Sequence, residues 1–196
     1  MGRIQLPLKV FISYSHQDEE SKIQLIEHLQ SLIRQGYIEL SYDDMILPGE
    51  SVDQKILQAI HESHITLLLV SAAYLGSRYC YEIELKEIMA LRDKGMVVIP
   101  VLLRPVDLEG TPFSGLMFLP EDRKAISTFS NKDEAFMSVA LGIRRVVEDC
   151  YKKHIPGMRG ASQQVDTMEQ ISVRNANNGF VFENNNIYNG HFEIKR

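Results

Sequence analysis

One mostly apolar segment that ends in hydroxyl and acidic side chains constrains the fold of this chain most strongly. Leu8 to Ile12 reads as a strand buried on both faces. The run stops at Ser13 to His16, and Asp18 and Glu19 then open a segment with helical spacing. In open α/β sheets, ligands bind where the carboxyl end of a strand meets the next helix. We therefore expect the functional site at this strand end.

Strand-like and helix-like segments alternate along the chain after this first strand. Apolar runs predict further strands at 37–42, 65–71 and 96–103, with a weaker fifth strand at Ala125–Phe129. Helical spacing predicts helices over 23–36, 51–61, 79–91 and 132–151, with Ile23 and Ile83 among the side chains on their apolar faces. This alternation is typical of a parallel sheet with helices on both sides.

Composition excludes several classes of function. The chain has 196 residues, a formal net charge of −5 and a sequence pI near 5.7, which argue for one main core and against a nucleic-acid partner. Cys80 and Cys150 lack metal-ligand spacing, so we expect no metal site. No signal peptide or run of membrane-spanning length is evident, so we expect a cytoplasmic protein without a membrane partner.

The composition changes after residue 154. We expect a main domain over 1–154, a linker over 155–170 and an asparagine-rich, β-prone tail over 171–196, where seven asparagines and two Asn-Gly pairs occur. Low net charge and alternating apolar residues favour cross-β stacking. The tail is therefore either an amyloid-signalling motif that recruits a partner with a similar motif, or a docked hairpin or disordered end.

Four motifs follow one another along the chain: FISYSHQDE (11–19), SYDDMILPGES (41–51), SRYCYEIEL (77–85) and VIPV (98–101). Together they resemble the Toll/interleukin-1 receptor (TIR) domain, especially its bacterial NAD-cleaving members, and the second is similar to the family's BB loop. The resemblance covers about residues 8 to 152 and implies a flavodoxin-like sheet of five parallel strands in the order 2-1-3-4-5.

The third motif resembles the helix that carries the catalytic glutamate of TIR enzymes, and two glutamates compete for that role. The Glu-Leu-x-x-Ile pattern selects Glu84, whereas the common Trp-Cys-x-x-Glu spacing, counted from Cys80, falls on Ile83. Bacterial members with a Tyr-x-x-x-x-Glu spacing match Tyr79 and Glu84. We therefore favour Glu84 over Glu82 as the catalytic residue.

The resemblance also implies which residues bind the dinucleotide. NAD⁺ would be the substrate, with no separate cofactor. This chain has Ser15 and His16 where many TIR enzymes carry an arginine that could pair with the pyrophosphate. The binding residues implied are Tyr14, Ser15, His16, Asp43, Leu47, Pro48, Gly49, Tyr79 and Cys80.

These features predict an NAD⁺ glycohydrolase that breaks the nicotinamide–ribose bond in defence or cell-death signalling, including defence against phage. The resemblance implies activation by self-association through TIR–TIR contacts, with filaments as one form of the assembly. The alternative is a non-catalytic TIR adaptor that acts by binding other TIR domains.

Overall fold

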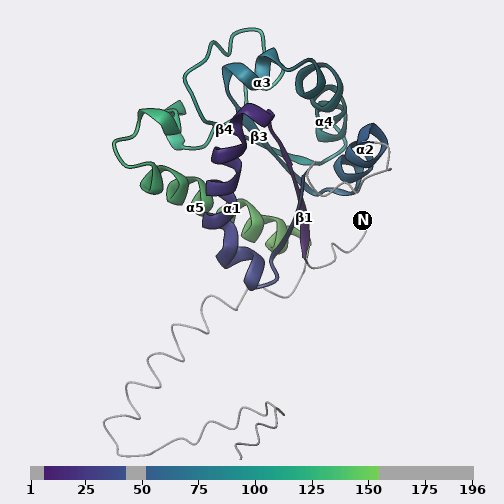
Figure 1. Ribbon diagram of the computed structural model, residues 1–196. Helices are drawn as coiled ribbons and strands as arrows, with labels where there is room; N and C mark the ends of the chain where they lie inside the picture. Colours follow the sequence, from purple (N-terminus) through teal and green to yellow (C-terminus); the bar gives the residue numbers. More distant parts are fainter. Residues whose placement is uncertain (1–6, 43–51, 155–196) are drawn as a thin grey trace, which may run out of the picture. The chain divides into compact units, whose positions relative to one another are not determined.

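The computed structural model describes residues 7–42 and 52–154 (Figure 1). Four parallel strands form one sheet in the order β2-β1-β3-β4: β1 (Leu8–Ser13), β2 (Ile38–Ser41), β3 (Ile65–Val70) and β4 (Val97–Leu102). The predicted α/β class and the order of the first four strands are confirmed. The predictions for Asp43, Leu47, Pro48 and Gly49, the linker and the asparagine-rich tail lie outside the described residues.

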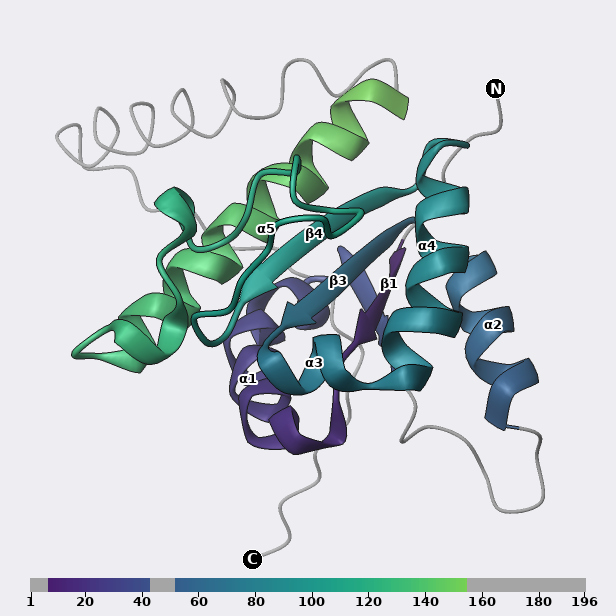
Figure 2. The same ribbon diagram turned by 90° about the horizontal axis from the view of Figure 1, so that it is seen from above.

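Helices cover both faces of the sheet (Figure 2). The helices α1 (Glu19–Arg34) and α5 (Lys132–His154) lie on one face, whereas α2 (Val52–Glu62) and α4 (Leu85–Arg92) lie on the other. Alternate strand residues feed two separate cores, as the pleat of a strand requires. Val10 and Ile12 of β1 join the core under α1 and α5, while Phe11 joins the core under α2 and α4.

The apolar stripe of α1 differs in one respect from the predicted one. Leu25, Leu29 and Leu32 are buried as expected, but Ile23 is 48% exposed, and the aliphatic stem of Lys22 is buried instead. Lys22 tolerates burial because its ammonium binds the Glu19 carboxylate at 2.7 Å and lies over the Tyr14 ring. Pairing with Glu19 thus lets Lys22 be buried where hydropathy alone predicts that Ile23 is buried.

The predicted fifth strand is wrong. Residues Ile126–Thr128 form the 3₁₀ helix η5, because the Thr128 amide and hydroxyl both donate to the Ala125 carbonyl and close a turn. Leu119 lies beside β4 in its place: its amide donates to the Pro100 carbonyl at 2.9 Å, and its carbonyl accepts from the Leu102 amide at 2.8 Å. The neighbour of β4 at this edge is therefore a one-residue bridge in the described part of the chain.

The strand order creates a switch point between β1 and β3. The chain moves from β1 to β2 on one side of the sheet, and then returns to β3 and β4 on the other side. Loops that leave the carboxyl ends of β1 and β3 therefore diverge, which leaves a crevice between them. Two short helices lie at this edge, η1 (His16–Asp18) and α3 (Ala72–Gly76), followed by the π-helical turn η3 (Tyr79–Glu84). Before η5 in the chain, a further 3₁₀ turn, η4, covers Glu121–Arg123.

No helix within 7–42 and 52–154 combines the length and the apolar character needed to cross a bilayer.

The end of α1 depends on a left-handed glycine. Gly36 has a φ of +71°, and the amides of Gly36 and Tyr37 donate to the carbonyls of Ile33 and Leu32. Gly36→Ala should lower the free energy of unfolding by about 1–2 kcal/mol, since an L side chain is disfavoured at that φ. Urea unfolding measures this loss. Gly115→Ala is the control, because no atom lies within 4 Å of the added methyl group and its φ is not left-handed; equal losses in both variants would contradict the explanation.

Candidate functional site

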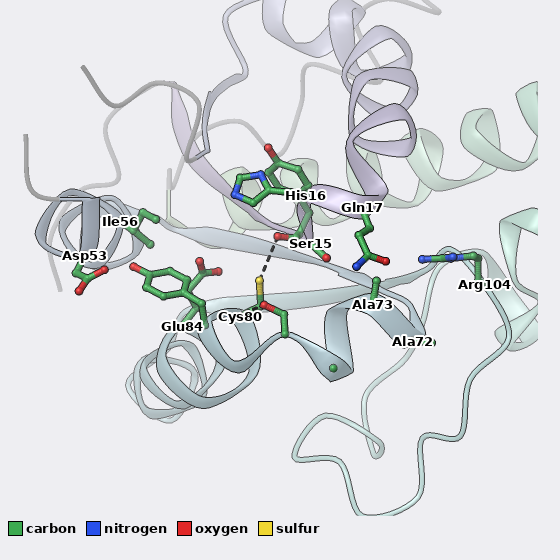
Figure 3. A pocket seen from close by; sticks show the side chains of 14 residues that line it. Ser15, His16, Gln17, Asp53, Ile56, Ala72, Ala73, Cys80, Glu84 and Arg104 are labelled. Carbon is green, nitrogen blue, oxygen red and sulfur yellow. Dashed lines mark hydrogen bonds between the residues drawn. The ribbon is translucent and has the colours of Figure 1, made fainter. Parts of the chain in front are cut away.

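A cavity of about 850 Å³ opens at the carboxyl ends of β1 and β3 (Figure 3). Its size lies within the range of pockets that hold small molecules, roughly 300–1,000 Å³. Segments from five parts of the sequence form its walls: the β1–α1 loop, the start of α2, the α3 region, the turn before α4 and the segment after β4. The lining residues are Tyr14, Ser15, His16, Gln17, Asp53, Ile56, Ala72, Ala73, Gly76, Ser77, Tyr79, Cys80, Glu84 and Arg104.

The carboxyl group of Glu84 is held on the wall of this cavity by a hydroxyl at the end of β1. Glu84 is only 4% exposed, and Ser13 Oγ donates to Glu84 Oε2 at 2.5 Å. The hydroxyl of Tyr74 lies 3.1 Å from the same Ser13 oxygen. Burial raises the pKa of Tyr74 far above its ordinary value, so this hydroxyl stays protonated and donates to Ser13. Tyr74, Ser13 and Glu84 thus form a hydrogen-bonded chain, called the Ser13 chain below.

A π-helical turn explains the unusual spacing between Cys80 and Glu84. Within η3 the Leu85 amide donates to the Cys80 carbonyl five residues earlier, rather than four. This wider turn holds one more residue, so Cys80 and Glu84 both face inward and are buried. Ile83, predicted to face inward, is instead 41% exposed. The periodicity prediction failed at this position because it assumed an unbroken α-helix.

The two candidate glutamates have different surroundings. Glu82 lies on the outer side of the turn, where its side chain is 62% exposed and pairs with Arg78 at 3.1 Å. Glu84 lines the cavity together with Tyr14, Ser15 and His16. Only Glu84 is therefore positioned to meet a molecule in the cavity.

The residues that the resemblance assigned to the dinucleotide meet at this cavity wherever the structure describes them. Cys80 Sγ donates to the Tyr14 carbonyl oxygen at 3.2 Å, which ties the turn before α4 to the loop after β1 (Figure 3). The Tyr14 hydroxyl donates to Glu19 at 2.9 Å and accepts from the buried Lys22 ammonium at 3.0 Å. These bonds fix the Tyr14 backbone and ring at the cavity rim.

Tyr79 places a buried hydroxyl beside an acidic group. Within the described ranges its Oη atom is buried and makes no hydrogen bond of ordinary geometry. Burial raises the pKa of this hydroxyl well above its ordinary value, and the nearby Asp53 carboxylate raises it further. Tyr79 therefore remains a hydrogen-bond donor over the whole physiological pH range.

Eight of the fourteen lining residues were not among those that the sequence assigned to the site: Gln17, Asp53, Ile56, Ala72, Ala73, Gly76, Ser77 and Arg104. Arg104 is held by a group outside the lining, Asp18. The Asp18 carboxylate accepts a hydrogen bond from Ser71 at 2.5 Å on one oxygen and from Arg104 Nη2 at 2.7 Å on the other. This cluster, called the Asp18 clamp below, joins segments that follow β1, β3 and β4. Arg104 comes directly after the predicted strand 96–103, so the strand-end rule applied to the first strand could have flagged it.

Sequence comparison shows that the chain belongs to the TIR domain family, whose profile matches residues 10–140. It is 43% identical over 136 residues to the uncharacterised protein y4lF of Sinorhizobium fredii, which covers 69% of this chain and 42% of that protein. It is 29% identical over 92 residues to the disease resistance protein RPV1 of Vitis rotundifolia, which covers 47% of this chain and 6% of that protein. The chain thus spans less than half of either relative.

Among solved structures, the TIR domain of the Toll-related receptor TRR-2 from Hydra magnipapillata is similar to this chain. The TM-score is 0.46 at 22% sequence identity, and the likeness covers 56% of this chain and 81% of that one.

Removing the extra residue of the π turn tests its role in register. Deletion of Ile83 shortens the Cys80–Glu84 spacing to the one that an α-helix accommodates, so the fold should persist with a Tm lowered by no more than about 5 °C. Deletion of Lys86, which is also exposed but lies within α4, should turn all later side chains by about 100° and abolish cooperative unfolding. Circular dichroism melting compares the two. Equal loss of structure would show that the π turn does not absorb the extra residue.

Proposed function

We propose that this TIR domain cleaves NAD⁺ at the bond between nicotinamide and ribose. The observation that carries the proposal is the carboxyl group of Glu84, buried against the sheet edge and yet facing an 850 Å³ cavity. A buried acid is costly unless it is hydrogen-bonded, and the Ser13 chain supplies part of that bonding. Such an acid facing a cavity is a feature of functional sites rather than of a solvated helix surface.

The chemistry needs only one acidic side chain. When the C1′–N1 bond of NAD⁺ breaks, its electron pair goes to the pyridinium nitrogen, and nicotinamide leaves as a neutral molecule without a proton donor. Positive charge then develops on the ribose carbon, and the Glu84 carboxylate stabilises that charge and orients the ribose hydroxyls. Water adds to the ribosyl cation and loses a proton, which yields ADP-ribose.

Other lining groups suit the remainder of such a ligand. Small side chains at Ala72, Ala73 and Gly76 leave room in the cavity, while Tyr79 offers an aromatic face. Asp53 places a second acidic group near the Glu84 wall, where it favours a cationic ring. The membership in the TIR family further supports an assembly-dependent activity in defence or cell-death signalling.

Replacing the two glutamates separately tests the proposal. Glu84→Gln should reduce nicotinamide release at least about 10²–10³-fold with unchanged circular dichroism, because the charge stabilisation of the transition state is lost. Glu82→Gln is the matched control and should leave turnover intact, since Glu82 is exposed and pairs only weakly with Arg78.

The assay should be run over a series of protein concentrations with a crowding agent, because we propose that self-association activates the domain. Specific activity should then rise with concentration. Equal turnover by Glu84→Gln and the unaltered chain would defeat the assignment. If the unaltered chain consumed no NAD⁺ at any concentration, the non-catalytic adaptor function would remain.

The Ser13 chain provides a graded second test. Ser13→Ala should lower kcat about 10–100-fold, because a hydrogen bond to a charged group contributes about 1.5–3 kcal/mol, whereas Tyr74→Phe should lower it only a few-fold. KM should change little, since both residues act through Glu84. Ser63→Ala removes a serine hydroxyl that donates to the Ala59 carbonyl, away from the cavity lining, and should leave kcat unchanged. A Ser13→Ala enzyme with normal kcat would count against the positioning role.

A further inference from the structure

The charged groups of the cavity are segregated. Glu84 and Asp53 lie on one side of the group of side chains drawn in Figure 3, and Arg104 lies on the opposite side. Arg104 is the only lysine or arginine among the lining residues that the structure describes. The cavity therefore offers one acidic end and one basic end to a ligand.

Arg104 is held so that much of its guanidinium group stays available. Its side chain is 47% exposed. In the described part of the chain it donates one hydrogen bond, from Nη2 to the Asp18 carboxylate. A guanidinium carries five N–H donors in a rigid fork, so most of them remain for water or a ligand. Its planar geometry matches the oxygens of phosphate groups.

The Asp18 clamp pre-positions this cation. Asp18 is 5% exposed, and Ser71, with no exposed surface, holds its other carboxylate oxygen. A side chain fixed in this way loses little conformational freedom when a ligand binds. The same carboxylate also offsets part of the positive charge of Arg104. We therefore expect Arg104 to orient a bound anion through its N–H donors more than to attract anions from a distance.

We propose that Arg104 forms an anion subsite for the diphosphate of the dinucleotide. This inference rests on the proposed function, because NAD⁺ carries a cationic ring at one end and an anionic diphosphate further along. The ligand then lies with its nicotinamide ribose at Glu84 and its phosphates toward Arg104, so that each charge meets its opposite. Arg104 is thus a specificity-determining residue: it binds the diphosphate and takes no part in bond cleavage.

A purely structural role for Arg104, as the partner of a buried Asp18, makes a different prediction from an anion subsite. If the pair only supports the fold, Asp18→Asn and Arg104→Gln should weaken ligand binding alike. If Arg104 binds the diphosphate, the two changes should act differently. Asp18→Asn removes a competing negative charge but keeps an amide oxygen that can accept from Arg104, whereas Arg104→Gln removes the group that binds the anion.

The test is the affinity of the full-length chain for ADP-ribose, measured by isothermal titration calorimetry. This probe carries the diphosphate and needs no turnover, so its result is independent of the nicotinamide-release assay. Arg104→Gln should raise Kd at least about tenfold, Arg104→Lys should raise it less, and Asp18→Asn should leave it unchanged or lower it. Arg145→Gln is the matched control, an arginine paired with Glu121 on the surface at 3.0 Å, and should leave Kd unchanged.

The double variant Asp18→Asn/Arg104→Gln guards against misfolding, because it leaves no buried charge without its partner. It should bind ADP-ribose as weakly as Arg104→Gln while melting like the unaltered chain. The proposal is overturned if the unaltered chain does not bind ADP-ribose, if Arg104→Gln binds normally, or if Asp18→Asn and Arg104→Gln weaken binding equally. Arg104-dependent binding without nicotinamide release would instead refute only the proposed reaction.

Discussion

The hydrogen bond from Ser13 to Glu84 is the interaction on which the organisation of the site depends. Ser13 is the last residue of the central strand β1, and Glu84 comes from a turn 71 residues later in the sequence. Taking an acidic side chain out of water costs several kcal/mol unless donors replace its hydration. The bond therefore links the rigid sheet to the turn before α4 and keeps an acidic group at the cavity wall.

Two other links connect the segments around the cavity. Cys80 binds the Tyr14 carbonyl, and the Asp18 clamp joins the segments after β1, β3 and β4. Each link begins or ends next to a strand of the sheet, so the site inherits the rigidity of the core. A site built on strand ends positions its side chains better than one built on long loops.

Much of the fold follows from the sequence, because the apolar pattern is strong where strands are buried on both faces. Every residue of β3, Ile65–Val70, is buried, and all of them except Thr66 are apolar. This strand was therefore easily predicted. The fifth strand failed because short-range hydroxyl bonds at Thr128 closed a turn in a segment with strand-like composition. The predicted burial of Ile23 and Ile83 was wrong for local reasons as well. Near Ile23 the paired Lys22 is buried in place of an apolar side chain, and at Ile83 a π turn shifts the helical phase.

The candidate site was only partly predictable for a related reason. Tyr14 and Ser15 are adjacent in the sequence and follow an obvious strand, and Glu84 lies within a recognisable motif. Arg104 has no motif of its own, and only the parallel order of β1, β3 and β4 brings it to the same cavity as Tyr14. Long-range placement of this kind depends on the sheet topology, which a pattern within one segment does not contain.

The most direct measurement is a crystal structure of the Glu84→Gln chain with NAD⁺ bound, since this variant should bind the dinucleotide without consuming it. The nicotinamide ribose should then lie against residue 84 in the cavity at the carboxyl ends of β1 and β3. A dinucleotide bound elsewhere, or bound in this cavity with its nicotinamide ribose remote from residue 84, would contradict this prediction.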